Sequence, residues 1–168
     1  QELLTFFKNP RKFVIGVCNG FQLLIKMGVF GDNISLEENT SGRFESRFLP
    51  MEVIENRKHN TYFDGMEDTI FGIWCAHKMG RITIKNTDHK FIPVLKYTDG
   101  GYPMNPNGSF ENIAGVVNLD GRILGLMPHF ERSFINYQCA YIPPEYSKIH
   151  KSPWFIIGQN IAKFLEQV

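Results

Sequence analysis

A cysteine stands between two glycines at residues 16–20, Gly-Val-Cys-Asn-Gly, and this arrangement suits nucleophilic chemistry. In a nucleophile elbow the reactive residue occupies a strained turn between a strand and a helix, and Cys18 would be the thiol version. Gly16 and Gly20 would let the helix pack close to the strand. The helix N-terminus would favour the thiolate, and the Asn19 N–H would be placed to donate to an oxyanion. A buried structural cysteine is the alternative, because free cysteines are among the most buried residues.

A thiol nucleophile needs a base and a group that orients the base. His129 follows an apolar run in the segment GLMPHFER, two residues before Glu131. A carboxylate at that spacing can orient the imidazole and stabilise its charged form, so Cys18, His129 and Glu131 are predicted to form a triad. The alternative is a turn histidine followed by a solvated acid at a helix start. The histidines in polar stretches are expected at the surface: His59, His89 and His150.

Hydrophobic periodicity predicts the elements that would position these side chains. Residues 12–17, KFVIGV, are typical of a strand buried on both faces of a parallel sheet, and residues 19–28 change to helical spacing. Asp120-Gly121 predicts a hairpin turn, and Ser152 with Pro153 predicts the start of a C-terminal helix. Further strands are expected at residues 47–55, 69–75, 81–85, 91–97, 112–118 and 122–127.

Composition restricts the class of protein. A chain of 168 residues that is 43% hydrophobic is expected to form one domain. Its 18 basic and 17 acidic residues form no long block of one sign, which argues against nucleic acid or a membrane surface as a partner. Three cysteines without a C-x-x-C pair predict neither a disulfide framework nor a metal site. No apolar run approaches the roughly 20 residues of a membrane span, so we expect a cytoplasmic protein.

Five segments in register resemble the C-terminal glutaminase domain of phosphoribosylformylglycinamidine synthases, which are class I glutamine amidotransferases of purine biosynthesis. The segments are GVCNG, ENTSGRFESR, YPMNPNGS with IAGV and DGR downstream, MPHFER and SPW. The resemblance implies a flavodoxin-like α/β fold, with a mostly parallel sheet, flanking helices and an added antiparallel portion. We therefore expect residues 1–168 to form one glutaminase domain.

The resemblance also implies a reaction. Cys18 would attack the side-chain amide of glutamine, His129 would protonate the leaving ammonia, and Glu131 would hold His129. Water would then release glutamate. The positions implied to bind the substrate are Asn19, Gln22 and His77. No cofactor is implied for this domain. ATP and magnesium belong to a synthetase domain, of the same or a partner chain, which uses the ammonia to convert formylglycinamide ribonucleotide to formylglycinamidine ribonucleotide.

The sequence departs from the family pattern in several places. WCAHKMGR stands where the family commonly has W-x-A-H-G-E-G-R, so Lys78 and Met79 replace Gly and Glu in a loop expected near glutamine. Phe130 replaces a proline beside His129. The family places several strands and a glycine loop ahead of the nucleophile, so Cys18 near the N-terminus predicts a truncated fragment with an incomplete oxyanion hole. Two alternatives follow: a catalytically silent structural domain, and a related cysteine amidohydrolase acting on another amide.

Overall fold

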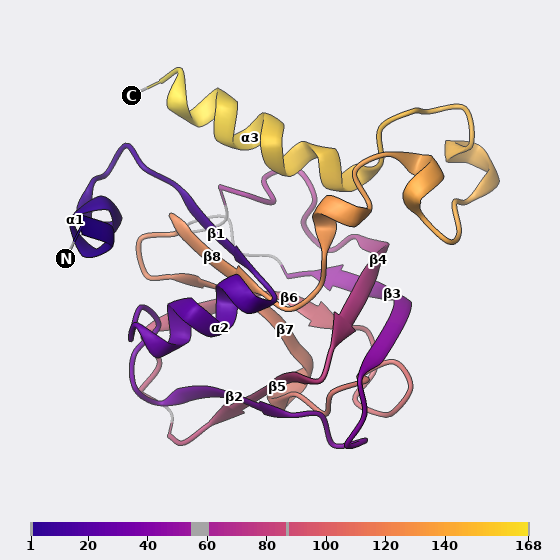
Figure 1. Cartoon of the computed structure of the whole chain (residues 1–168). Coiled ribbons are helices and arrows are strands. Elements are labelled where there is room, and N and C mark those ends of the chain that lie inside the picture. Colours follow the sequence, from indigo (N-terminus) through magenta and orange to yellow (C-terminus); the bar gives the residue numbers. More distant parts are fainter. Residues whose placement is uncertain (1, 55–60, 87, 168) are drawn as a thin grey trace.

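The computed structural model describes residues 2–54, 61–86 and 88–167, and these build a six-stranded sheet with a separate two-stranded sheet beside it (Figure 1). The strands are β1 (Val14–Val17), β2 (Ile34–Glu38), β3 (Glu45–Val53), β4 (Ile70–His77), β5 (Met79–Ile84), β6 (Phe91–Tyr97), β7 (Ile113–Asn118) and β8 (Ile123–Leu126). The large sheet has the order β1-β8-β7-β6-β3-β4, and β2 pairs with β5. β1 and β8 run parallel, whereas the other described pairs are antiparallel. The α/β fold confirms the predicted class, but the parallel part of the described sheet is limited to β1 and β8, and the antiparallel portion is larger than expected.

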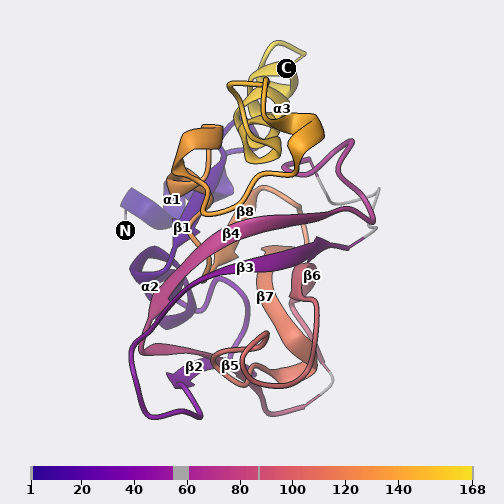
Figure 2. The ribbon, with the colours of Figure 1, turned by 90° about the vertical axis from the view of Figure 1, so that its right-hand side faces the viewer.

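Two helices pack on opposite faces of the large sheet. Because side chains alternate along a strand, Ile123 of β8 belongs to one buried cluster and Leu124 to the other. α2 (Asn19–Lys26) contributes Phe21 to the first cluster, and α3 (Ile156–Leu165) contributes Ile157 to the second. Figure 2 shows β3 and β4 side by side, with α3 at one end of the molecule and the β2–β5 pair at the other. No helix in the described part of the chain is long and apolar enough to cross a membrane.

Most predicted elements are confirmed with small shifts of their ends. The hairpin between β7 and β8 turns at Gly121, whose φ is 70°. Ser152 Oγ accepts a hydrogen bond from Trp154 N at 3.2 Å, and Pro153 opens a short 3-10 turn that leads into α3. The helix predicted over residues 19–28 ends at Lys26, because Gly28 already has a φ of 72°. Two predictions lie outside the described residues: the surface position of His59, and residue 55 at the end of the strand predicted over 47–55.

Two elements were not predicted. α1 (Glu2–Lys8) buries none of its residues, so it has no apolar periodicity directed at a core. β2 is five residues long, ends in two glutamates and pairs only with β5. Pairing between such distant segments leaves no local signal in the sequence.

The parallel pair determines where the predicted reactive groups lie. Parallel neighbours end at the same edge of a sheet, and the register places Val17 beside Leu126. Cys18 follows the first strand directly, and His129 follows the second after a short turn. The topology therefore brings together two residues that are more than a hundred positions apart in the sequence.

Candidate active site

Cys18 occupies the turn between β1 and α2 in a backbone conformation that residues other than glycine rarely adopt. Its φ is 51° and its ψ is −105°, and such backbone strain costs of the order of 1–3 kcal/mol. Its N–H donates to Leu126 O at 2.8 Å. A Cβ on Gly16 would lie 2.5 Å from Leu24 Cδ1, so glycine is needed there. A Cβ on Gly20 would meet open space. The close packing predicted for both glycines therefore depends on Gly16 and not on Gly20.

The N-terminus of α2 lies directly beside Cys18, which is the N-cap residue of this helix. Asn19 is the first residue of α2, and the first N–H groups of an α-helix have no acceptor within the helix. The Cys18 side chain makes no capping hydrogen bond to them. Its sulfur lies 3.8 Å from Ala76 O of β4 instead. The Cys18 side chain thus leaves the first N–H groups of α2 uncapped beside the sulfur.

His129 is held between β8 and β4. Its N–H donates to Trp74 O at 2.7 Å, which ties the turn after β8 to the edge strand β4. Its Nδ1 lies 2.6 Å from Glu131 Oε1. Its Nε2 is buried and has no hydrogen-bond partner within the described ranges of the chain. The structure therefore places Glu131 behind His129, at the predicted spacing, and the Cys18 sulfur is the neighbour that most favours a proton on the imidazole.

The neighbours of His129 favour its charged form. The Cys18 sulfur and the Glu131 carboxylate raise the pKa of His129 from 6.5 to about 9, against the opposing effect of burial. Burial alone would raise the pKa of Glu131, but the hydrogen bond and charge of His129 together with a backbone hydrogen bond and the charge of Arg132 keep that pKa below its ordinary value. Arg132, whose Nε is 3.8 Å from Glu131 Oε1, acts in the same direction. At neutral pH the pair is an imidazolium beside a carboxylate.

A cavity of about 450 Å³ opens beside the thiol and the imidazole. This volume is within the range of roughly 300–1,000 Å³ of small-molecule sites. The lining residues are Val17, Cys18, Asn19, Gln22, Phe44, Ala76, His77, Lys78, Met79, His129 and Arg132. The structure therefore brings together every residue predicted for the site: all line the cavity except Glu131, which contacts His129.

The second histidine of the cavity has the opposite charge preference. His77 ends β4 and is 2% exposed. Burial and the charge of His129 lower the pKa of His77 to about 4, although Glu45 acts in the other direction. His77 is therefore a neutral imidazole at pH 7, while His129 is charged.

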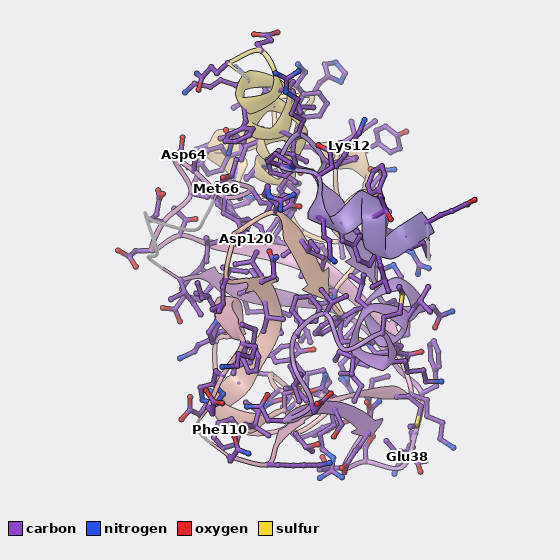
Figure 3. All side chains as sticks on the ribbon, turned by 90° about the vertical axis from the view of Figure 1, so that its left-hand side faces the viewer. Lys12, Glu38, Asp64, Met66, Phe110 and Asp120 are labelled. Atoms are coloured by element: carbon purple, nitrogen blue, oxygen red, sulfur yellow. The ribbon has the colours of Figure 1, made fainter. Side chains whose placement is uncertain are left out.

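The side chain of Gln22 forms a hydrogen bond with the protein backbone at Met79. Its Nε2 donates to Met79 O at 2.7 Å, across the turn between β4 and β5. The adjacent Lys78 points its Nζ to Glu38 Oε1 at 3.0 Å, and both side chains are about half exposed. Glu38 lies at the end of the molecule opposite α3 (Figure 3). The two residues that depart from the family pattern thus lie on a turn that Gln22 supports.

Phe130, the third departure from the family pattern, packs in the hydrophobic core. Phe130 is 6% exposed and packs edge-to-face on Phe134, with ring centroids 5.3 Å apart. The hydrogen bond between His129 and Trp74 and the contact between His129 and Glu131 are both present beside it. A phenylalanine at this position is therefore compatible with the His129 turn.

Several residues of the site were not found from the sequence. Phe44, Ala76 and Arg132 line the cavity, and two buried asparagines, Asn39 and Asn107, bond to the turn that carries His77. The segments 38–47 and 102–109 carried the family resemblance, which was the available signal, but no residue in them was assigned a role. Among the described residues, no group of three or more His, Cys, Asp and Glu side chains could hold a metal ion.

Comparison with known proteins identifies relatives over most of the chain. A family model for the CobB/CobQ-like glutamine amidotransferase domain matches residues 1–165. A probable phosphoribosylformylglycinamidine synthase from Caenorhabditis elegans is 36% identical over 165 residues, covering 83% of this chain and 12% of that protein. A phosphoribosylformylglycinamidine synthase subunit PurQ from Picrophilus torridus is 39% identical over 147 residues, covering 80% of this chain and 58% of that protein.

A solved structure supports the same relationship. The structure of PurLQS from Thermotoga maritima matches with a TM-score of 0.72 at 30% identity, covering 91% of this chain and 62% of the matched chain. The present chain thus spans less than two thirds of the length of these relatives, and about an eighth of the length of the Caenorhabditis elegans protein.

Proposed function

The chain belongs to the family of CobB/CobQ-like glutamine amidotransferase domains, and from this premise we propose that it hydrolyses glutamine to glutamate and ammonia. The observation that carries the proposal is the arrangement around the cavity. A thiol on a strained turn lies beside a helix N-terminus and beside a charged His–Glu pair, whose imidazole it helps to keep protonated.

In the proposed first half-reaction, the Cys18 thiolate forms a bond to the amide carbon of the glutamine side chain. The electron pair of the C=O bond moves to the oxygen, where the Asn19 N–H donates to the oxyanion. His129 then gives its Nε2 proton to the amide nitrogen as the C–N bond breaks. Ammonia leaves, and a thioester between Cys18 and the substrate remains.

The second half-reaction uses the same residues in reverse. Neutral Nε2 of His129 takes a proton from water, and the resulting hydroxide attacks the thioester carbon. The C–S bond breaks, which releases glutamate and restores the Cys18 thiolate. Glu131 keeps the imidazole oriented in both steps and stabilises its charged form. General acid–base catalysis of this kind contributes about 10²–10⁴-fold to a rate.

We also propose that the ammonia serves a synthetase domain of the same or a partner chain. The support is the naming of the relatives, which are phosphoribosylformylglycinamidine synthases or their PurQ subunits. ATP and magnesium would act in that synthetase domain, in the conversion of formylglycinamide ribonucleotide to formylglycinamidine ribonucleotide. Residues 1–168 would then act as one glutaminase domain, and the cytoplasmic location stays a prediction.

The test is covalent labelling of the full-length protein by a diazo-ketone analogue of glutamine, read by mass spectrometry. Label is expected on Cys18, blocked by excess glutamine and lost in Cys18→Ser. Cys139→Ser is the matched control, because Cys139 is also a partly exposed free thiol but lines a different cavity. If Cys18 stays unlabelled with the synthetase and its ligands present, the glutaminase proposal fails and the silent structural domain takes its place. Release of ammonia from another amide, but not from glutamine, would favour the related amidohydrolase.

A further inference from the structure

The turn that joins β4 to β5 accepts a hydrogen bond at every one of its carbonyl groups. We use this name for residues 77–80, which are the last residue of β4, Lys78 and the first two residues of β5. Three of them line the cavity beside Cys18. The bonds are Asn39 Nδ2 to His77 O (2.8 Å), Asn39 N to Lys78 O (2.8 Å), Gln22 Nε2 to Met79 O (2.7 Å) and Asn107 Nδ2 to Gly80 O (2.8 Å). Asn39 and Asn107 are 3% and 0% exposed. Buried amides from two distant segments therefore fix this wall of the cavity.

The orientation of the Asn107 amide is determined by its partners. Its Oδ1 accepts from the backbone N–H of Ser109 at 3.0 Å and from Ser109 Oγ at 2.7 Å. A backbone N–H can only donate, so the oxygen must lie on that side. The Nδ2 group then faces Gly80 O at 2.8 Å, Tyr97 OH at 2.9 Å and His77 Nε2 at 3.1 Å. It has two N–H bonds, so one serves Gly80 O and the other is shared between Tyr97 OH and His77 Nε2.

This orientation determines the tautomer of His77. An amide NH₂ group has no acceptor capacity, so Nε2 must be the unprotonated nitrogen of the ring. The proton of the neutral imidazole then lies on Nδ1, which is buried and has no hydrogen-bond partner among the described residues. Protonating Nε2 would set two donors against each other at 3.1 Å, between His77 and Asn107.

The charged and titratable groups around His77 come from three elements. Glu45 is its cross-strand partner on β3 and pairs with Arg47 at 2.8 Å. Tyr97 reaches from β6, and burial keeps its pKa well above 10, so it is uncharged. His129 lies on the turn after β8 and carries a positive charge. Glu45 favours a proton on His77, whereas His129 and the amide of Asn107 oppose it.

We propose that Asn107 is a positioning residue that holds His77 as the Nδ1–H tautomer and so keeps a second cation away from Cys18 and His129. Its amide supplies the donor that occupies Nε2, and its bond to Gly80 O fixes the turn on which His77 lies. The consequence for activity rests on the proposed function. The consequence for the proton on His77 does not.

The first measurement reads the titration of each histidine in the full-length protein, through hydrogen–deuterium exchange at the imidazole C2 followed by mass spectrometry. In the wild type, His77 is expected to titrate well below the ordinary histidine pKa of 6.5. Asn107→Asp keeps an acceptor for Ser109 but places a carboxylate at Nε2, so the His77 midpoint should rise by about one pH unit or more. Asn33→Asp is the control, because Asn33 is also a buried amide, 7% exposed, outside this cavity.

The second measurement is the pH profile of glutamine hydrolysis by the same variants. In Asn107→Asp the raised midpoint of His77 still lies below neutral pH, so the second charge appears on the acid limb of kcat/KM, which should move to higher pH while the alkaline limb stays in place. Asn33→Asp should keep the wild-type profile. A residue that only stabilised the fold would change the amount of active protein without moving either limb.

Each result decides the inference. An ordinary midpoint for His77 in the wild type overturns it, and so does an Asn107→Asp variant in which the midpoint is unchanged. The wild-type measurement still applies if Asn107→Asp does not fold. Labelling of Cys18 together with an ordinary His77 would reject the inference and keep the glutaminase. Absence of labelling with a low His77 midpoint would reject the glutaminase and keep the role of Asn107.

Discussion

The two sides of the cavity beside Cys18 are built in opposite ways. On one side, a cysteine is held at a φ of 51°, and the Nε2 of His129 is buried without a hydrogen-bond partner in the described chain. On the other side, residues 77–80 have a donor for each carbonyl group. The thiol and the imidazole thus have few fixed hydrogen-bond partners among the described residues, whereas a fully bonded segment forms the facing wall of the cavity.

The same contrast appears in the two histidines of the cavity. His129 has a carboxylate 2.6 Å from Nδ1, and its pKa is raised to about 9. His77 has an amide donor 3.1 Å from Nε2 and is almost fully buried, and its pKa is lowered to about 4. The histidine with a carboxylate beside one ring nitrogen is thus the charged one, and the histidine with an amide donor there is the neutral one. Mutations on the two sides should therefore have different signatures.

The largest effect is expected on the side of the cavity that carries Cys18 and His129. His129→Ala removes the proton donor to the leaving ammonia, so kcat/KM for glutamine hydrolysis should fall about 10³-fold, within the range for general acid–base groups. The measurement is glutamate release by the full-length enzyme. His150→Ala replaces an exposed histidine and should keep wild-type activity. A loss of less than tenfold in His129→Ala would show that another group supplies the proton.

The next largest effect is on the pH dependence of stability. Below its ordinary pKa of 6.5, His77 binds a proton in the unfolded chain but not in the folded protein until about pH 4. The free energy of unfolding should therefore fall as the pH drops through this window, by on the order of 3 kcal/mol from His77. His129 acts at the other end: its contribution is complete below pH 6.5 and is lost as the pH rises to about 9.

Urea unfolding across this pH range is the measurement. His77→Gln should flatten the acid side and leave the alkaline side unchanged, whereas His129→Gln should do the reverse. His150→Gln should alter neither side. An acid side that keeps its slope in His77→Gln would assign that slope to the carboxylates and remove the contrast between the two histidines.

The sequence predicted one side of the cavity far better than the other. Cys18 with its flanking glycines, and His129 with Glu131, are patterns of neighbouring residues whose geometry follows from one turn each. The parallel pairing of β1 and β8 then brings the two turns together. Predicting a strand for each apolar run was sufficient to place them at one edge of the sheet.

The supporting side could not be predicted in this way. Asn107 contacts His77 across thirty positions, and Asn39 contacts it across thirty-eight. Buried amides have no periodicity, and their partners are backbone carbonyls, which every residue carries. Gln22 illustrates the limit, because the resemblance implied a place for it in the site, where it lies, but its bond to Met79 O has no signal in the sequence. Local patterns therefore predicted the thiol, imidazole and carboxylate that the structure brings together, but not the amides that bond to the facing wall of the cavity.

A smaller effect on activity should come from the carboxylate behind the imidazole. Glu131→Gln keeps an acceptor near His129 Nδ1 but removes the charge, so the pKa of His129 should fall towards 6.5. We expect kcat/KM to fall about 10²-fold, which is less than the loss of about 10⁴-fold in a buried triad, because the Glu131 side chain is 43% exposed. The pH profile of kcat/KM is the measurement, and the alkaline limb should move to lower pH. An unchanged limb would exclude Glu131 as the group that holds the charge.

The smallest effect is expected at the exposed edge of the supporting side. The Lys78 and Glu38 side chains are 53% and 50% exposed, and exposed ion pairs contribute about 0–1 kcal/mol. In a double-mutant cycle of Lys78→Ala and Glu38→Ala, the coupling in the free energy of unfolding should therefore stay below about 0.5 kcal/mol. The turn should keep its shape, because its carbonyl bonds come from Asn39, Gln22 and Asn107. A coupling above about 1 kcal/mol would mean that charge at the rim, and not the buried amides, holds this side of the cavity.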